Sequence, residues 1–383
     1  MRLLPASLLV ATGSALAAGV ATTPKCSLGA CALIAKAVSP ASSVFLPGSP
    51  EYASDMVHFA ANAETNATCS VQPGTAADVG KALAIIGACK TPFAIKGGGH
   101  NLNPGFASTT GVQLTMTRFN KVVYDAKANT AEVGAGLIWD DVYRNLEPHG
   151  VGVVGGRATG VGVAGYLLGG GYSYKTNQYG LGVDNVVAVE LVLPSGEVKC
   201  ITHKSDPDLF FAVRGGGNNF GIVTKFTLKT HPQPQVWGGS LTYDSTQVDA
   251  VTSALVNFTK TSKDPKSGLQ CTYATLTGQQ IVMVNIFYNA PTPPAGMFDA
   301  FLAIPSAAND VSSRSYLSMI LSANTNITAG FRGVYNTISH KSVPVELTTA
   351  VRNETSFFSA ALAGGSFAAN AYGVVCIFVS QRE

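Results

Sequence analysis

The chain has 383 residues, of which 46% are hydrophobic and only 12% charged, and its formal net charge is +3. This composition is typical of a folded globular protein, and a chain of this length usually divides into two domains. No basic run or stripe accompanies the small net charge, so nucleic acid and acidic membrane surfaces are excluded as expected partners. The 41 glycines are clustered, and clustered glycine marks backbone that turns sharply or lies against a ligand.

The N-terminus has the features of a secretory signal peptide ending near residue 18. Arg2 precedes an apolar run that extends to Leu16, and residues 15–17 have the small-x-small form of a cleavage site. A buried N-terminal helix is the alternative interpretation. No later stretch is apolar and long enough to span a bilayer, so we expect a secreted protein or one of the secretory pathway, without a membrane anchor.

Sequons and cysteines agree with this location. Four N-x-S/T sequons occur, at Asn66, Asn257, Asn326 and Asn353. An oxidising compartment permits disulfides, and the odd number of cysteines leaves at least one thiol unpaired within the chain. The seven cysteines are Cys26, Cys31, Cys69, Cys89, Cys200, Cys271 and Cys376. Pairing Cys26 or Cys31 with Cys89 would fasten the N-terminal arm to the first helix, and no spacing resembles a zinc site, so no metal is expected.

The regular pattern begins after a Pro/Ser-rich arm at residues 39–50. Thr75 opens a variant of the capping box, and Val79, Leu83 and Ile86 give the following helix one apolar face. Further on, helices are predicted at residues 139–146 and 206–213, and alternating residues at 187–193 and 198–201 predict a hairpin. Other strands are expected at residues 68–71, 93–95, 112–116, 121–125, 130–134 and 222–228.

The amino-acid composition changes after His231, where glycine becomes sparse. Strands at residues 238–243, 271–276, 280–288 and 372–379, with helices at 245–260 and 294–302, predict a sheet covered by helices in an α+β arrangement. We therefore expect a signal peptide at 1–18, an arm at 19–64, a first domain at 65–235 and a second domain at 236–383.

Three Gly clusters lie in the first domain, at residues 97–99, 160–171 and 215–217, each beside a predicted strand. Adjacent N–H groups without side chains suit anionic oxygens such as those of a pyrophosphate, although a single cluster often only turns a corner. Residues 160–165 also fit G-x-G-x-x-G, but glycines before and after this stretch argue against the strand and helix of a Rossmann site. The three clusters together favour a site for a pyrophosphate-bearing ligand.

His100 ends the first cluster, and its imidazole is a potential nucleophile with free approach to a ligand. Residues 93–101, FAIKGGGHN, resemble the phosphate-binding loop of the vanillyl-alcohol oxidase and p-cresol methylhydroxylase (PCMH) superfamily of flavoproteins. Two later stretches resemble the same family in the same order, GYLLGGGYSYKTNQYGLGVDN at 165–185 and DPDLFFAVRGGGNNFGIVT at 206–224. Together they are similar to the berberine-bridge-enzyme-like branch, with its fungal secreted oxidases, over residues 65–235.

The resemblance implies an α+β fold, with a PCMH-type FAD-binding domain of two subdomains and an α+β substrate domain built on an antiparallel sheet. It implies that FAD extends between the subdomains, that the loop at residues 96–101 contacts the diphosphate, and that His100 holds the isoalloxazine covalently. The cofactor-binding residues expected on this basis are Lys96, Gly97, Gly98, Gly99, His100, Asn101, Val163, Gly165, Tyr166, Gly221, Ile222 and Val223.

Two departures from the family's pattern affect these expectations. Some members attach the flavin to both a histidine and a cysteine, and Ala158 stands at the cysteine position, so a single bond through His100 is expected. The family's chains usually continue past the second domain and return a segment to the flavin. This chain stops at Glu383, so we expect a truncated substrate domain, and an inactive flavin-binding remnant is one alternative.

The resemblance predicts an FAD-dependent oxidase that takes a hydride from a C–H bond next to oxygen or nitrogen and passes electrons to molecular oxygen. A dehydrogenase of the same fold and a secreted binding protein without flavin are further alternatives. Tyr273 and Tyr288 are candidates for the catalytic base, whereas Asp125, Asp140 and Asp141 are expected at the surface. Carbohydrates, alcohols, and alkaloid-like or polyketide intermediates are all compatible small-molecule substrates.

Overall fold

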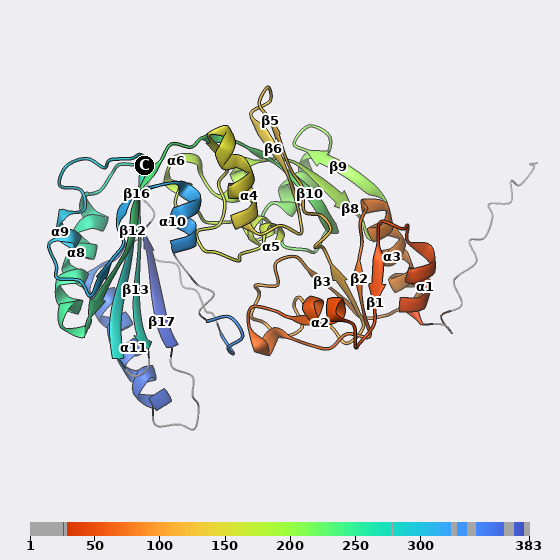
Figure 1. Cartoon of the computed structure of the whole chain (residues 1–383), viewed down its shortest axis with the longest axis horizontal. Coiled ribbons are helices and arrows are strands. Elements are labelled where there is room, and N and C mark those ends of the chain that lie inside the picture. Colours follow the sequence, from red (N-terminus) through yellow and green to blue (C-terminus); the bar gives the residue numbers. More distant parts are fainter. Residues whose placement is uncertain are drawn as a thin grey trace, which may run out of the picture.

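The computed structural model describes Cys26 and residues 29–276, 279–322, 328–334, 342–363 and 371–378. The predicted signal peptide and the sequon at Asn326 lie outside the described residues. Figure 1 shows an N-terminal part with two larger sheets beside a C-terminal part built on one tall sheet. Short 3-10 helices occupy Ala61–Ala63, Glu147–His149, Gly182–Asn185 and Ser245–Gln247.

The first sheet is small and mostly parallel, with strands in the order β1-β2-β4-β3 and only β1 antiparallel to its neighbour. The Thr75 side chain accepts a hydrogen bond from the N–H of Asp78, which confirms the predicted start of the first long helix. Disulfides Cys26–Cys89 and Cys31–Cys69 fasten the N-terminal arm to this subdomain. Its elements are α1 (Ala30–Ala37), β1 (Ser43–Phe45), α2 (Pro50–Met56), β2 (Cys69–Gln72), α3 (Ala76–Cys89), β3 (Phe93–Lys96) and β4 (Val112–Thr115).

The second sheet is antiparallel, with strands in the order β5-β6-β10-β8-β9, and a two-stranded ribbon of β7 and β11 stands beside it. The elements of this subdomain are β5 (Val122–Asp125), β6 (Thr130–Gly134), α4 (Trp139–Leu146), β7 (Val151–Gly152), α5 (Val163–Leu168), α6 (Thr176–Tyr179), β8 (Val186–Val192), β9 (Val198–Thr202), α7 (Pro207–Val213), β10 (Ile222–Lys229) and β11 (His231–Pro232).

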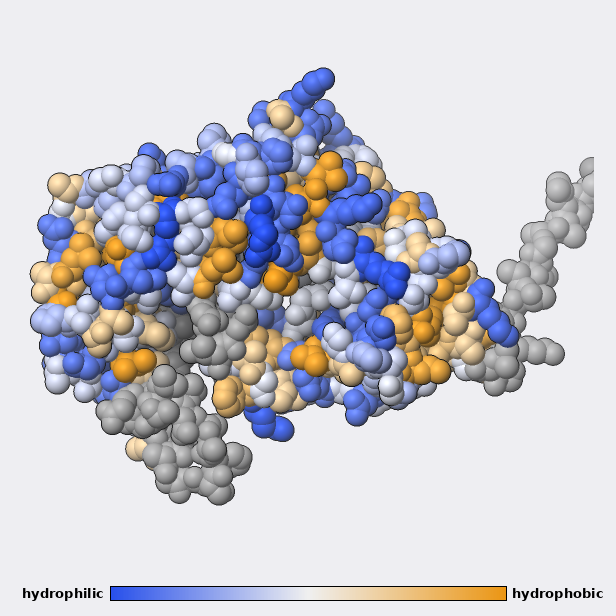
Figure 2. Space-filling view, viewed as in Figure 1, coloured by the Kyte–Doolittle hydropathy of each residue, from blue (hydrophilic) through white to orange (hydrophobic). Residues whose placement is uncertain are grey.

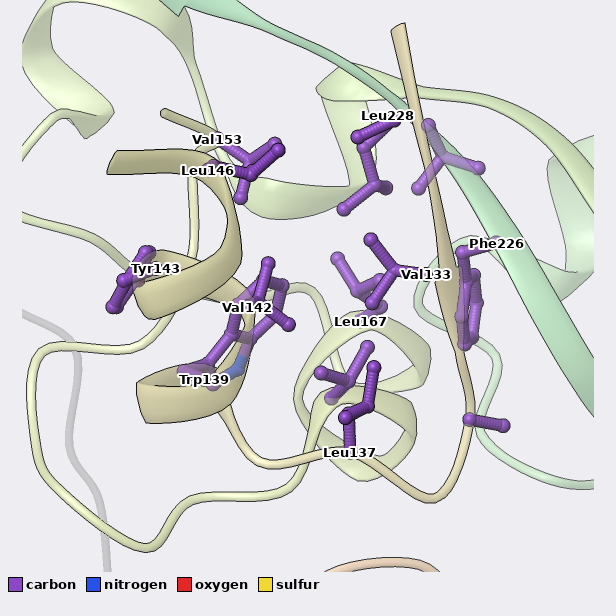
Figure 3. Close-up of a cluster of buried hydrophobic side chains, with 14 of the residues drawn as sticks. Val133, Leu137, Trp139, Val142, Tyr143, Leu146, Val153, Leu167, Phe226 and Leu228 are labelled. Carbon is purple, nitrogen blue, oxygen red and sulfur yellow. The ribbon is translucent and has the colours of Figure 1, made fainter. Parts of the chain in front are cut away.

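The core of the second subdomain is formed by α4 and α5 against the sheet. Figure 3 shows Trp139 and Val142 of α4 facing Val133 of β6, with Leu167 of α5 close by. Trp139 is fully buried, and Phe226 of β10 belongs to the same cluster. Burying an aliphatic or aromatic side chain of this size contributes roughly 1.5–3 kcal/mol, so this cluster fixes α4 and the loops at its ends.

The third sheet is antiparallel, in the order β15-β12-β14-β13-β17 with β16 also paired to β12. Helices α8, α9 and α11 cover its outer face, whereas α10 packs against α4 and joins the two parts (Figure 1). The elements are β12 (Val236–Asp244), α8 (Val248–Thr261), β13 (Ser267–Leu276), β14 (Gln279–Tyr288), α9 (Asp299–Leu302), β15 (Ala308–Asn309), β16 (Ser312–Arg314), α10 (Tyr316–Ser322), α11 (Val345–Ala363) and β17 (Ala371–Phe378).

The predicted α+β class with an antiparallel second sheet is confirmed. The helix expected at residues 294–302 is shorter than predicted, because Gly296 adopts a φ of 81° and α9 begins only at Asp299. Figure 2 shows apolar residues in small groups between hydrophilic ones on the face drawn. Within the described ranges, no helix has the length and apolar character needed to cross a membrane.

Candidate functional site

The three Gly clusters, although distant in sequence, converge on α5. A Cβ atom at Gly98 would lie 2.5 Å from the Cα of Gly162, so the first and second clusters touch backbone to backbone. The N–H of Gly217 donates to the carbonyl oxygen of Leu168, 2.9 Å away, which joins the third cluster to the end of α5. The fold therefore gathers Gly-rich backbone from three separate loops, as an extended anionic ligand requires.

His100 lies at the end of the first loop, and its ring stacks on Phe59 with centroids 4.0 Å apart. The Nε2 atom of His100 is buried and has no hydrogen-bond partner in the described part of the chain. Burial lowers the pKa of His100 below its ordinary 6.5, against a smaller opposing effect of a backbone hydrogen bond. A neutral imidazole with an unsatisfied buried nitrogen fits a ligand that the polypeptide does not itself supply.

The side chains of Lys96 and Asn101 shape the first loop. The Nζ atom of Lys96 donates to the carbonyl oxygens of Ser54 and Asp55, at 3.2 and 3.0 Å, where α2 ends. The Oδ1 atom of Asn101 accepts from the N–H of Asn103 at 2.8 Å and closes a local turn. These contacts direct Lys96 to the end of α2 and Asn101 back onto its own loop, which leaves the backbone of residues 96–101 as the part suited to a ligand.

Tyr166 of α5 has a second unsatisfied polar atom. Its ring packs edge-on against Trp139, with centroids 4.9 Å apart, and its hydroxyl is buried without a hydrogen-bond partner among the residues described. In the same helix Val163 is buried, whereas Gly165 is exposed and a Cβ there would meet nothing within 4 Å. Open space at Gly165 beside an unpartnered hydroxyl is compatible with a bound polar group on this side of α5.

Gly221 directly precedes β10, and Ile222 and Val223 begin this strand in the middle of the second sheet. A Cβ at Gly221 would lie 2.5 Å from the carbonyl oxygen of Val192, so the backbone passes too close for a larger residue. The side chains of Ile222 and Val223 are buried in two different hydrophobic clusters. Any contact of these three residues with a ligand therefore has to come from their backbone.

A segment of the C-terminal part, residues 330–333, lies against the connection between α2 and β2. The N–H of Gly330 donates to the carbonyl oxygen of Phe59 at 2.8 Å, and the N–H of Ala61 donates to that of Phe331 at 3.0 Å. The amide of Asn62 accepts from the N–H of Gly333 and donates to its carbonyl oxygen, at 2.7 and 3.1 Å. We call residues 330–333 the strap, which supports Phe59 and through it the ring of His100.

Asp140 holds the second Gly cluster in place. The prediction that it lies at the surface is wrong, because its side chain is buried and accepts hydrogen bonds from the hydroxyl of Thr159 and the N–H of Gly160. The surface positions of Asp125 and Asp141 are confirmed. The sequence feature that could have predicted the burial of Asp140 is its position in the first turn of α4, next to the buried Trp139.

Arg157 is a residue that the sequence patterns did not single out. Its guanidinium lies over the ring of Tyr172, 4.5 Å from the centroid, and its Nη1 donates to the Oε1 of Gln270 at 3.1 Å. Gln270 belongs to β13, so this bond crosses from the Gly-cluster part to the third sheet. Burial raises the pKa of Tyr172 to about 12, with the charge of Arg157 opposing that shift.

The third sheet presents a polar face to Arg157 and to the N-terminal part of the chain that carries the three Gly clusters. Gln270 pairs in register with Asn285, and Thr272 with Met283, and all four side chains are half-buried. On the same face of β14, Phe287 stacks on Tyr174 with centroids 4.9 Å apart. Polar groups and packed rings of both parts therefore meet across this surface.

The two tyrosines predicted as candidate bases lie on the opposite face of that sheet. The hydroxyl of Tyr273 is 2.9 Å from that of Thr252 in α8, and the hydroxyl of Tyr288 donates to Asp264 at 2.9 Å. Both belong to the hydrophobic cluster under α8 and α9. Because side chains alternate along a strand, neither residue reaches the face that meets the Gly-cluster part.

Lys175 is the most deeply buried cation in the described structure. Its Nζ donates to the Oε1 of Gln233 at 2.8 Å and lies 4.6 Å from the centroid of Tyr316. Burial lowers the pKa of Lys175 to about 7. A cavity of about 260 Å³ lies beside this group, between α4, β7 and α10, with Gly152, Gln233 and Tyr316 in its wall.

In the described ranges no group of three or more His, Cys, Asp and Glu side chains is arranged to hold a metal. Three Gly-rich loops converge, and an antiparallel sheet covers them. This arrangement defines an FAD-binding protein of the PCMH type. Residues 67–202 match the family model of an FAD binding domain. The chain is similar in sequence to FAD-linked oxidoreductases and FAD-dependent monooxygenases, and it shares its fold with a berberine-bridge-enzyme-like protein.

Two curated relatives are similar over most of the chain. One is named an uncharacterized FAD-linked oxidoreductase of Arthroderma benhamiae, 36% identical over 319 residues, which cover 82% of this chain and 64% of the relative. The other is an FAD-dependent monooxygenase of Aspergillus calidoustus, 34% identical over 307 residues, which cover 78% of this chain and 58% of the relative. The chain thus spans less than two thirds of the length of either relative.

Solved structures share the fold at low sequence identity. The 6-hydroxy-D-nicotine oxidase of Arthrobacter nicotinovorans is 22% identical with a TM-score of 0.67, covering 76% of this chain and 65% of that one. A berberine-bridge-enzyme-like protein of Physcomitrella patens is 23% identical with a TM-score of 0.65, covering 78% and 64%. A glucooligosaccharide oxidase of Acremonium strictum, described with a 6-S-cysteinyl, 8α-N1-histidyl FAD, is 20% identical with a TM-score of 0.64, covering 76% and 62%.

Proposed function

We propose that the protein is an FAD-dependent oxidase acting on a small organic substrate. The observation that carries this proposal is the convergence of three Gly loops on α5 beside His100 and Tyr166, each with a buried polar atom that lacks a partner in the described structure. FAD, when bound, would accept a hydride from a C–H bond next to oxygen or nitrogen and deliver the electrons to molecular oxygen.

In this proposal the backbone of residues 96–101 holds the diphosphate, and the backbone near Val163, Gly165 and Tyr166 and at residues 221–223 lines the flavin. Glycine contact between Gly98 and Gly162 lets these loops approach closely enough to share one ligand. The third sheet supplies the wall opposite, from Gln270, Thr272, Met283 and Asn285.

We propose further that His100 forms a single covalent bond to the flavin. Its neutral imidazole has a free lone pair, and the Acremonium strictum oxidase is described with a comparable histidyl link. The new C–N bond would replace a C–H bond of the ring methyl and the N–H bond of the imidazole, and the two protons and two electrons released would reduce one molecule of oxygen to peroxide. Ala158 offers no sulfur for a second link.

A monooxygenase is the second candidate function, because the Aspergillus calidoustus relative carries that name. The two activities use the same cofactor and differ in the fate of oxygen, which is released as peroxide by an oxidase and enters the product of a monooxygenase. A dehydrogenase of the same fold would react with oxygen only slowly.

Secretion belongs to the same proposal. The two disulfides need an oxidising compartment, and the described sequons at Asn66, Asn257 and Asn353 are exposed. A covalent bond would also keep the cofactor in place outside the cell, where FAD is not replenished.

The test of the flavin proposal is acid precipitation of the purified protein and of two variants. Wild type and the exposed control His203→Ala should both retain yellow colour in the pellet, whereas His100→Ala should release it or never acquire it. Colour released from wild type would refute the covalent bond, and a protein purified without any flavin would refute the proposed function.

The role of oxygen is tested without knowing the substrate. The flavin is reduced by light with a sacrificial donor under nitrogen, and the protein is then mixed with oxygenated buffer. Rapid reoxidation with one peroxide per flavin supports an oxidase, whereas reoxidation over many minutes supports a dehydrogenase. Because no substrate is present to take up oxygen, a monooxygenase would also release one peroxide per flavin here, and it is distinguished from an oxidase by incorporation of oxygen into a product.

A further inference from the structure

We propose that Arg157 and Gln270 bind an acidic group of the substrate, a carboxylate or phenolate. The inference rests on the proposed function, because it takes the surface between the Gly loops and the third sheet to be the substrate site. It narrows the substrate class from small organic molecules in general to molecules that carry an anionic oxygen.

The geometry leaves Arg157 with unused donors on this surface. One of its five N–H groups donates to Gln270 at 3.1 Å, and the guanidinium lies 4.5 Å from the centroid of Tyr172 and 5.8 Å from that of Tyr174. Aromatic rings on one side keep the planar fork in a fixed orientation. A guanidinium group held in this orientation is suited to bind a carboxylate through two parallel N–H···O hydrogen bonds.

The charge of Arg157 has no acidic partner in the described parts of the chain. Arg314 pairs with Asp310 at 3.1 Å and Arg144 with Asp141 at 2.7 Å. Arg118 and Arg214 also lack an acidic partner among the described residues, but each donates to two or more neutral oxygens. Arg157 is half-buried, and its hydrogen-bond partner Gln270 is neutral. A cation taken partly out of water is normally compensated by an anion, which here would have to arrive with a ligand.

The opposite wall and the backbone around Arg157 agree with this interpretation. The half-buried side chains beside Gln270 on that face, Thr272 and Asn285, are neutral hydrogen-bonding groups, so nothing there repels an anion. The neighbouring backbone is fixed, because the hydroxyl of Tyr143 donates to the carbonyl oxygen of Gly156 at 2.8 Å. Arg157 is therefore positioned in advance of binding, which lowers the entropic cost of recognition.

The experiment compares matched ligands by isothermal titration calorimetry on the purified protein. The probes are benzoate against benzamide and glucuronate against glucose. We expect the charged member of at least one pair to bind tenfold or more tightly, Arg157→Gln to lose this preference, and Arg157→Lys to keep part of it. The exposed control Arg144→Gln should behave as wild type. No preference in the wild type, or a preference that survives in Arg157→Gln, overturns the inference.

A second variant guards against a folding defect in the first. Gln270→Glu would place a carboxylate at hydrogen-bond distance from Arg157, so it should abolish the preference while the protein stays folded. Sulfite affinity of the bound flavin is measured alongside. If Arg157→Gln weakens sulfite binding tenfold and leaves the ligand preference unchanged, the charge serves the cofactor and the inference is wrong. Calorimetry needs no flavin, so absence of yellow colour refutes the proposed function separately.

Discussion

Replacing the buried Lys175 with methionine should make the protein more stable near neutral pH and change how stability depends on pH. The pKa of Lys175 is lowered from its ordinary 10.5 to about 7 by burial. A group that loses its proton on folding holds fewer protons in the folded state, here between about pH 7 and 10.5. Wild-type stability therefore rises with pH across this window and is lowest, as far as Lys175 is concerned, at pH 7 and below.

The magnitude follows from the difference between the two pKa values. The full effect is about 5 kcal/mol across the window, of which roughly 2 kcal/mol falls between pH 7 and pH 9. Methionine also removes the hydrogen bond to Gln233 and the contact with Tyr316, each contributing about 1–2 kcal/mol. We expect Lys175→Met to be about 1–3 kcal/mol more stable than wild type at pH 6–7, and this advantage to disappear or reverse by pH 9.

The assay is urea unfolding at pH 6, 7, 8 and 9, followed by tryptophan fluorescence. Trp139 is fully buried in the same core as Tyr316, so its emission reports on the region around Lys175. His231 titrates well below this range, since burial and the neighbouring lysines lower its pKa to about 4. The control Lys127→Met removes an exposed lysine and should follow wild type at every pH. Parallel stability curves for wild type and Lys175→Met would refute the reasoning.

Three further outcomes are expected. Gly98→Ala should lower the flavin content of the purified protein at least tenfold, because the new methyl group would meet backbone at 2.5 Å, whereas Gly87→Ala, with open space around it, should leave the content unchanged. Asp140→Asn should cost about 1–3 kcal/mol in urea unfolding by weakening bonds to the second Gly cluster, and an unchanged midpoint would contradict the role assigned to that carboxylate. Cys31→Ala should cost about 2–4 kcal/mol and lower Tm under non-reducing conditions, whereas Cys200→Ala should melt with the wild type.

Elements with local signals were predicted well from the sequence. The helix expected at residues 139–146 coincides with α4 (Trp139–Leu146), and the capping residue Thr75 marks the start of α3. Both depend on residues within one or two turns, which the sequence shows directly. The Gly clusters were equally readable, because only glycine tolerates the close approach seen between Gly98 and Gly162.

Features that depend on distant partners were not predictable in the same way. Asp140 was expected at the surface, and its burial is explained by partners 19 and 20 residues later, the hydroxyl of Thr159 and the N–H of Gly160. Arg157 meets Gln270 across 113 residues, and no local pattern distinguishes it from a surface arginine. Tyr273 and Tyr288 were named as candidate bases only because they lie in the second domain, and the alternation of side chains along β13 and β14 turns them towards the helices.

The strap has a consequence for how the protein is made. Asn62 is bonded to Gly333, 271 residues later, and Phe59 under the ring of His100 is held by the same segment. A ribosome delivers the Gly loops long before it delivers the strap, so the imidazole is supported on this side only after Gly333 has emerged. Cofactor attachment, if it follows the order of synthesis, would then be a late step that reports on completed folding of both parts.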